Sequence, residues 1–372
     1  MKKSLIALAA LSTIAGSAVA QSSVEVYGRI DQGYNNVELK NPNGTTTKAK
    51  NTGLDGGVGG SRLGFRGTED LGGGLKAGFV IEFGVDMGED VGANKTRLGF
   101  AQIESKDLGT ARIGRQVSPT KAVLDAFRPL SNNTNFRPGD FYYGGTRTLV
   151  DSTDTTGYLN ADQRVSNAIT YITPTIAGFS AQYQIAEVTN DTGTGTNTAS
   201  LGTIPKAALN AQDGQVDSTG ASLNYSAGNF AAAYAMFGMK TKAAGQTTID
   251  EEVNMFAASY DFGVAKLHAI YSQSEIKASG VKVTDRDLTT VGVTVPVGKW
   301  ALTAEYADGT AKAVLNGDDG QDVDGYKVRA MYNLSKRTGV YAQMGESKYK
   351  SKIASEGTTK VSGYNIGIAH TF

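Results

Sequence analysis

The chain has 372 residues, including 47 glycines and 17 tyrosines but only seven prolines and no cysteine. Its 36 basic residues equal its 36 acidic residues, so it lacks the positive charge with which proteins bind nucleic acid. Without cysteine it forms neither disulfides nor thiolate metal sites. A glycine share well above the usual level of roughly 7%, together with many tyrosines, favours a large all-β protein.

The first twenty residues have the pattern of an export signal. Met1, Lys2 and Lys3 give a positive start, an apolar run spans residues 5–15, and Ala18-Val19-Ala20 provides the small residues of a cleavage site. A membrane anchor needs about 20 apolar residues, and this run is shorter. We therefore expect residues 1–20 to be a cleaved signal peptide and residues 21–372 to form the mature domain.

Apolar and polar side chains alternate with a period of two along the rest of the chain. Val24, Val26 and Ile30 alternate with polar residues in the first such segment, and the pattern repeats to the end. We count about sixteen predicted strands, an even number typical of a closed antiparallel membrane barrel with apolar residues facing lipid. They begin near Val24, Ser61, Leu75, Lys95, Thr110, Arg164, Phe179, Ser218, Phe230, Glu252, Val264, Arg286, Trp300, Tyr326, Gly339 and Ser362.

The predicted connections alternate between short turns and long polar loops. The short ones are 70–74, 106–109, 174–178, 227–229, 261–263, 296–299 and 334–338. Short periplasmic turns opposite long outer loops are typical of outer-membrane barrels. All seven prolines fall in predicted loops, turns or strand ends, where a missing N–H breaks no ladder. A soluble β-sandwich is the alternative fold, but it has no reason to sort its loops by length.

Three segments carry a family resemblance. Residues 61–78 resemble the second strand, turn and third strand of Gram-negative general porins, especially the β-proteobacterial type. Residues 111–116 resemble the strand before the constriction loop of that family. The C-terminal end resembles the terminal strand that the barrel assembly machinery recognises, and its period of two puts four residues on one face: Tyr364, Ile366, Ile368 and Phe372.

The resemblance implies a sixteen-stranded trimeric barrel in the outer membrane, through which small hydrophilic solutes and ions diffuse passively. It implies a third loop folded into the lumen, and the longest connection, residues 118–163, fits that loop. Pro138-Gly139-Asp140-Phe141 resembles its acidic tip. We expect lipid, lipopolysaccharide, two further copies of the chain and the assembly machinery as partners, and no cofactor or metal.

Strand register identifies candidate residues of the pore constriction. The strands that begin near Ser61, Lys95 and Arg164 run from the outer face, and each carries an arginine at a similar depth. These three form a predicted basic wall, and three further arginines are weaker candidates: Arg62, Arg97 and Arg164, then Arg29, Arg66 and Arg115. Arg115 faces the lumen together with Arg112 only if a bulge separates them.

The facing acids are predicted on the third loop, at Asp125 and Asp140. Charges at the narrowest section set the ion selectivity of a pore, so this excess of basic residues predicts an anion preference. A solute-specific porin is the alternative function, and a structural or adhesive barrel is a third. Catalysis is not expected, because the two histidines, His268 and His370, have no nucleophile or carboxylate in a supporting motif.

Overall fold

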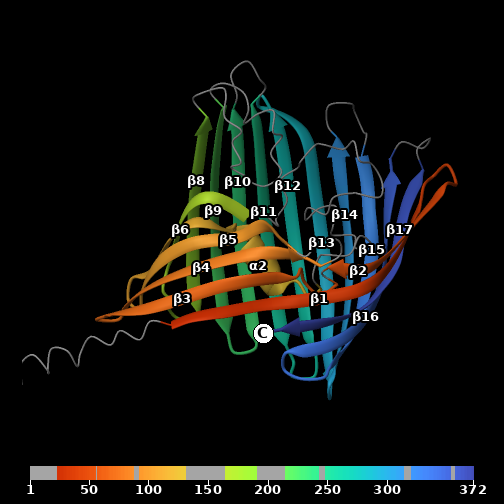
Figure 1. Cartoon of the computed structure of the whole chain (residues 1–372). Helices are drawn as coiled ribbons and strands as arrows, with labels where there is room; N and C mark the ends of the chain where they lie inside the picture. The colour runs from red at the N-terminus through yellow and green to blue at the C-terminus, as the bar shows by residue number, and fades with distance from the viewer. Residues whose placement is uncertain are drawn as a thin grey trace, which may run out of the picture.

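The computed structural model describes residues 23–55, 57–87, 92–130, 164–190, 214–242, 248–313, 320–352 and 357–372. Seventeen labelled strands form one antiparallel sheet that closes on itself, since the first strand pairs with the last. Figure 1 shows this ring of tilted strands with a helix inside it. In the described ranges, no helix has the length and hydropathy that a membrane span requires.

The strands follow one another around the ring in chain order. In the sequence, helix α2 comes between β6 and β7. Their bounds are β1 (Ser23–Lys40), β2 (Thr46–Asp55), β3 (Arg62–Gly72), β4 (Leu75–Asp86), β5 (Gly92–Ser105), β6 (Gly109–Val117), α2 (Pro119–Phe127), β7 (Arg164–Ile172), β8 (Phe179–Asn190), β9 (Gly214–Ala227), β10 (Phe230–Lys242), β11 (Ile249–Asp261), β12 (Lys266–Ala278), β13 (Val281–Val297), β14 (Trp300–Ala313), β15 (Gly320–Asn333), β16 (Thr338–Ser351) and β17 (Thr358–Thr371).

β2 and β3 are two parts of one barrel strand. Both pair with the same side of β1, where Asp55 is opposite Gln32 and Arg62 is opposite Arg29. The labelled strands therefore make a sixteen-stranded barrel, as the alternation predicts. The sequence pattern placed the start of the second strand near Ser61, which is only its lower part. The upper part was missed because residues 57–61 interrupt the pairing.

The short turns follow from residues that tolerate positive φ. β9 and β10 are joined through Gly228, with φ +55°, and β13 and β14 through Gly298, with φ +59°. A two-residue hairpin needs this left-handed conformation, which glycine adopts without a Cβ penalty. The predicted short connections at 227–229 and 296–299 are confirmed.

The outward face of the barrel is apolar and exposed, as predicted. The inward face is polar on much of the wall but apolar on β10 to β12, where alternation had predicted polar residues. Ala235, Phe237, Met255 and Ile270 point inward and are buried. The reason is helix α2, which lies inside the barrel and packs against β8 to β12. Its side chains Val123, Leu124 and Phe127 belong to the same buried hydrophobic cluster as these wall residues.

Helix α2 begins the predicted third loop, and the sequence contains its start signals. The side chain of Ser118 caps the helix by accepting a hydrogen bond from Lys121 N at 3.1 Å, and Pro119 occupies the first turn. Both features are typical of helix N-termini. The inward course of this segment, expected from the resemblance, is present over the described residues 118–130. Residues 131–163 lie outside the described part of the chain.

Two glycines on the wall make room for the ends of this segment. A Cβ on Gly220 would lie 2.8 Å from Cδ of Pro119, and a Cβ on Gly292 would lie 2.6 Å from Cγ of Pro129. Both distances are too short for carbon atoms. Because Gly220 on β9 and Gly292 on β13 have no side chains, the segment from Pro119 to Pro129 can lie flat against the inner wall.

We expect Gly220→Ala to destabilise the barrel by about 1–3 kcal/mol, the usual cost of overpacking. Gly238→Ala on the outward side of β10 is the matched control, since its Cβ would meet nothing closer than 3.7 Å. The measurement is the urea midpoint for unfolding in detergent, monitored by the loss of the heat-modifiable gel mobility of the folded barrel. Equal midpoints for both variants would contradict the tight fit of Pro119 on Gly220.

Candidate functional site

Two predicted arginines converge on one buried carboxylate inside the barrel. Arg97 Nε lies 2.6 Å from Glu82 Oε1, and Arg62 Nη1 lies 3.9 Å from the same oxygen. The hydroxyl of Tyr27 donates a further hydrogen bond to Glu82 Oε2 at 3.1 Å. Glu82 is only 5% exposed, so its charge is largely satisfied within this group. We call Arg29, Arg62, Arg97 and Arg164 with Glu82 the basic cluster.

Adjacent strands supply the basic cluster. Arg62 begins β3, Glu82 is on β4 and Arg97 is on β5, so the three side chains meet across neighbouring strands. Arg62 is also within electrostatic reach of Arg29 on β1 and Arg164 on β7. The structure thus brings together the three arginines of the predicted basic wall and one of the weaker candidates.

Strict alternation does not explain how Arg97 and Arg164 reach the lumen. Leu98 pairs with Glu82 and shares its inward face, and Val165 pairs with inward Gln116, so alternation from these neighbours would point both arginines outward. A register shift in the β4–β5 pairing leaves Arg97 as an extra residue that turns toward Glu82. The β6–β7 pairing contains a shift between Val165 and Ala168, whereas Arg164 pairs with Val117 at the start of β7. Such bulges redirect a side chain and are not visible as a period of two.

Arg66 belongs to a separate ion pair nearer the end of β3. Its Nε lies 2.8 Å from Oε2 of Glu25, its Nη2 lies 3.0 Å from Oε1, and its guanidinium stacks on Tyr27 at 5.2 Å. Both partners are more than half exposed. A solvated pair of this kind contributes little net field, so Arg66 is a minor member of the lumen wall.

A bulge lies beside Arg115, which was the condition for this arginine to share the lumen face with Arg112. The β6–β7 pairing shifts between Gly114 and Gln116, and Gly114 has φ +127°. Arg115 donates to the carbonyl of Thr96 at 2.9 Å and to Ser166 Oγ at 2.7 Å. Arg112 instead donates to Gln102 at 3.0 Å. Arg115 therefore holds strands β5 and β7 together above the site.

Of the two predicted loop acids, only Asp125 lies among the described residues. Asp125, on helix α2, forms ion pairs with Lys121 at 3.1 Å and Arg128 at 3.8 Å, and its side chain is about half exposed. Much of its charge is therefore balanced by its own segment. Asp140 lies outside the described residues. The role of both acids in the pore stays a prediction.

Sequence reasoning missed three inward residues of this region: Glu82, Asp31 and Arg329. A period of two puts Glu82 on the inward face of its strand, and its position in the sequence between Arg62 and Arg97 is a signal that could have paired it with them. Arg329 on β15 is within electrostatic reach of Asp31, Glu305 and Arg29. It extends the positive wall to the other side of β1, a relation that only barrel closure creates.

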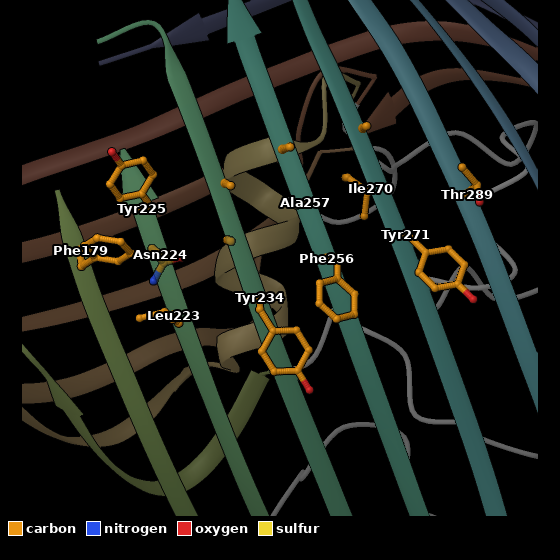
Figure 2. A pocket seen from close by; sticks show the side chains of 14 residues that line it. Phe179, Leu223, Asn224, Tyr225, Tyr234, Phe256, Ala257, Ile270, Tyr271 and Thr289 are labelled. Carbon is orange, nitrogen blue, oxygen red and sulfur yellow. The ribbon is translucent and has the colours of Figure 1, made fainter. Parts of the chain in front are cut away.

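The outward face of β10 to β12, opposite the face that contacts helix α2, meets lipid. Figure 2 shows the rings of Tyr234, Phe256 and Tyr271 on the side of β10 to β12 that faces away from helix α2. Beside this row of rings lies a shallow groove whose floor contains Ala232, Ala258 and Ala269. Amphipathic aromatic side chains of this kind form the interfacial girdles of membrane barrels.

The terminal strand β17 presents the four residues of the predicted assembly signal on the outward face. Tyr364, Ile366, Ile368 and Phe372 are each 43–56% exposed. Phe372 also closes the ring, since its N–H and carbonyl exchange hydrogen bonds with Gly28. Their surface position agrees with the predicted face, whereas recognition itself stays a prediction.

A closed β-barrel with an apolar outer band, girdles of aromatic rings and charged inward walls narrowed by an inner helix defines an outer-membrane channel. Comparison with known proteins gives the family. The model of the Gram-negative porin family matches residues 7–352, and the chain belongs to that family. It is a porin of the outer membrane, with a channel through the barrel.

Individual relatives are similar along their whole length. Outer membrane porin protein 32 of Delftia acidovorans is 32% identical over 390 residues, which cover 100% of both chains. The structure of an anion-selective porin from Comamonas acidovorans is 27% identical with a TM-score of 0.70, covering 94% of this chain and 100% of that one. OmpT of Vibrio cholerae, solved in a trimer form after in-vitro folding, shares the fold with a TM-score of 0.61, 15% identity and coverage of 94% and 99%.

We expect Glu82→Gln to increase the preference for anions, because it removes the carboxylate that offsets Arg62 and Arg97. One charge about 7 Å from a passing ion in water is worth about 0.6 kcal/mol, with opposite signs for chloride and potassium, so the chloride-to-potassium permeability ratio should rise several-fold. The reversal potential of the purified channel in a potassium chloride gradient measures it. Glu69→Gln, the same change on the exposed outward side of β3, is the control. A ratio that stays constant in Glu82→Gln would show that ions do not pass close to this cluster.

Proposed function

We propose that this porin is a passive diffusion channel for small hydrophilic solutes and ions, with a preference for anions. The observation that carries the proposal is the basic cluster: Arg62 and Arg97 share the buried carboxylate of Glu82, and Arg29 and Arg164 lie within electrostatic reach of Arg62. This surplus of positive charge faces the lumen. The solved relative described as anion-selective supports the same sign.

The cluster acts at short range. At physiological salt the Debye length is about 8 Å, so the arginines attract anions only where the lumen is narrow. Helix α2 fills the lumen beside β8 to β12 and pushes the open path toward the other side of the barrel. On that side β1, β3, β4 and β5 carry Arg29, Arg62, Glu82 and Arg97. The inner helix thereby supports a passage that runs along the basic cluster.

We also propose a homotrimer in contact with lipopolysaccharide. The trimer form of a protein with the same fold supports the first part. For the second, outward lysines above the aromatic girdle pair with carboxylates: Lys240 with Asp250 at 3.2 Å, Lys348 with Asp324 at 3.8 Å and Lys360 with Glu346 at 2.6 Å. Lysines bind phosphate, and carboxylates bind divalent cations, which are the two kinds of charge in a lipopolysaccharide layer.

We also propose that residues 1–20 act as a signal peptide that is removed during export, leaving residues 21–372 as the barrel domain. The assembly machinery then reads the outward face of β17. We infer a channel and not an enzyme, because His370 contacts Thr338 on the barrel exterior and His268 lies in the wall beside helix α2.

The function is tested with Arg62→Ala, Arg97→Ala and the double variant in planar bilayers. Each lost charge should lower the chloride-to-potassium permeability ratio several-fold on the same Coulomb argument, and the double variant should lie near neutrality. Lys48→Ala, which removes an outward charge paired with Glu38, should leave the ratio unchanged. Flux that saturates with one solute would instead indicate a solute-specific porin, and a wild-type protein without conductance would indicate a structural barrel.

Recognition of the terminal strand is tested with Phe372→Ser in cells. We expect the amount of folded protein in the outer membrane to fall several-fold, while refolding of the purified variant into detergent stays efficient. Val340→Ser on the outward face of neighbouring β16 is the control for lost lipid-facing area. If both variants fall equally, the loss reflects hydrophobicity and not the signal.

A further inference from the structure

The interruption between β2 and β3 turns into the lumen. Residues 57–61, which we call the inward loop, contact side chains that point inward from β1, β16 and β17. Gly57, Gly59, Gly60 and Ser61 are buried, and only Val58 is partly exposed. A break in a barrel strand leaves backbone donors and acceptors unpaired, which is costly at membrane depth unless the protein supplies partners.

Asp31 on β1 supplies the partners for the middle of the inward loop. Its Oδ2 accepts hydrogen bonds from the N–H groups of Val58 at 2.6 Å and Gly59 at 2.8 Å. The N–H of Asp31 donates to Ser61 Oγ at 3.0 Å. Asp31 is fully buried, at 0% exposure. Bonds from backbone N–H groups to a carboxylate are stronger than those between neutral groups, so this residue fixes the loop firmly.

Strands β16 and β17, which follow β1 around the closed ring, hold the other end of the inward loop. Tyr341 on β16 donates its hydroxyl to Oδ1 of Asp31 at 2.7 Å, and Gln343 donates to the carbonyl of Gly57 at 2.8 Å. A side chain at position 57 would overlap Tyr341 and Asn365. The loop is thus seated against β16 and β17 in a space that only glycine fits.

The inward loop also touches the basic cluster. Arg62 donates from Nε to the carbonyl of Gly60 at 3.0 Å. A Cβ at Gly59 would overlap the guanidinium of Arg29 and lie 3.4 Å from Nη2 of Arg62. The backbone of the loop therefore limits where both guanidinium groups can lie.

We propose that the inward loop is a second constriction of this pore and that Asp31 and Tyr341 are positioning residues, which hold the loop and through it Arg29 and Arg62. This inference rests on the proposed anion channel. It adds that selectivity depends on a hydrogen-bonded strand break as well as on the arginines themselves. Helix α2 narrows the lumen at β8 to β12, and the inward loop narrows it from β1 and β16.

A positioning role and a purely electrostatic role predict opposite changes in anion preference when the side chain of Asp31 is removed. If Asp31 acted only as a pore acid, losing its negative charge would raise the preference for anions. If it positions the loop, losing its side chain releases Arg29 and Arg62 and lowers that preference. Asn at this position separates the two effects, because its amide can still accept from Val58 and Gly59 and donate to Tyr341 while carrying no charge.

The experiment compares Asp31→Ala, Asp31→Asn and Tyr341→Phe by reversal potential and single-channel conductance. We expect Asp31→Ala to raise the conductance and lower the chloride-to-potassium ratio at least twofold, and Asp31→Asn to keep the ratio equal to or above wild type. Tyr341→Phe, which retains every charge, should shift both quantities in the direction of Asp31→Ala. Raised ratios in both Asp31 variants, with wild-type behaviour of Tyr341→Phe, would overturn the proposal.

A second measurement does not depend on ion preference or on folding of the Asp31 variants. The chain has no cysteine, so Val58→Cys introduces one thiol into the inward loop. An anionic methanethiosulfonate reagent should reduce the conductance of this variant and leave the wild type unaffected. Full modification without a change in conductance would place the loop outside the ion path and overturn the proposal. A wild-type channel without anion preference would refute the proposed function alone, because the reagent would still report on the loop.

Discussion

The structure depends on one constraint: within a bilayer each backbone N–H and C=O must find its partner inside the protein. Closure of β1 on β17 meets this requirement for the whole sheet, from Arg29 opposite Thr371 to Lys40 opposite Lys360. Closure also brings residues from the two ends of the chain together, so that Phe372 bonds to Gly28. The same requirement governs each place where the ladder is broken.

The lumen is shaped by elements that break the regular wall. Helix α2 covers an apolar inner face and makes the cross-section asymmetric, while the bulges at Arg97 and Arg115 turn charged side chains away from strict alternation. The inward loop replaces its lost ladder bonds with the carboxylate of Asp31. Pore geometry and charge placement thus come from the same local departures from ideal strands.

The charged cluster illustrates how a membrane protein tolerates buried ions. Glu82 is nearly inaccessible, yet it is bonded to Arg97 and Tyr27 and lies beside Arg62. Removal of one partner from such a group leaves an uncompensated charge, which is costly. The remaining positive charge of the cluster faces water in the lumen, where it can attract a passing anion.

The strand count, the outward stripes and the short turns follow from the sequence alone, because a period of two and turn residues are local features. Strict alternation does not account for the lumen positions of Arg97 and Arg164. The tertiary structure determines which residues from distant parts of the chain lie opposite one another. The apolar residues of β10 to β12 become explicable only beneath helix α2, and Arg97 reaches Glu82 only through a bulge. Asp31 meets Tyr341 across 310 positions of sequence. No local pattern encodes that contact, since it exists only once the ring has closed and the interrupted strand has turned inward.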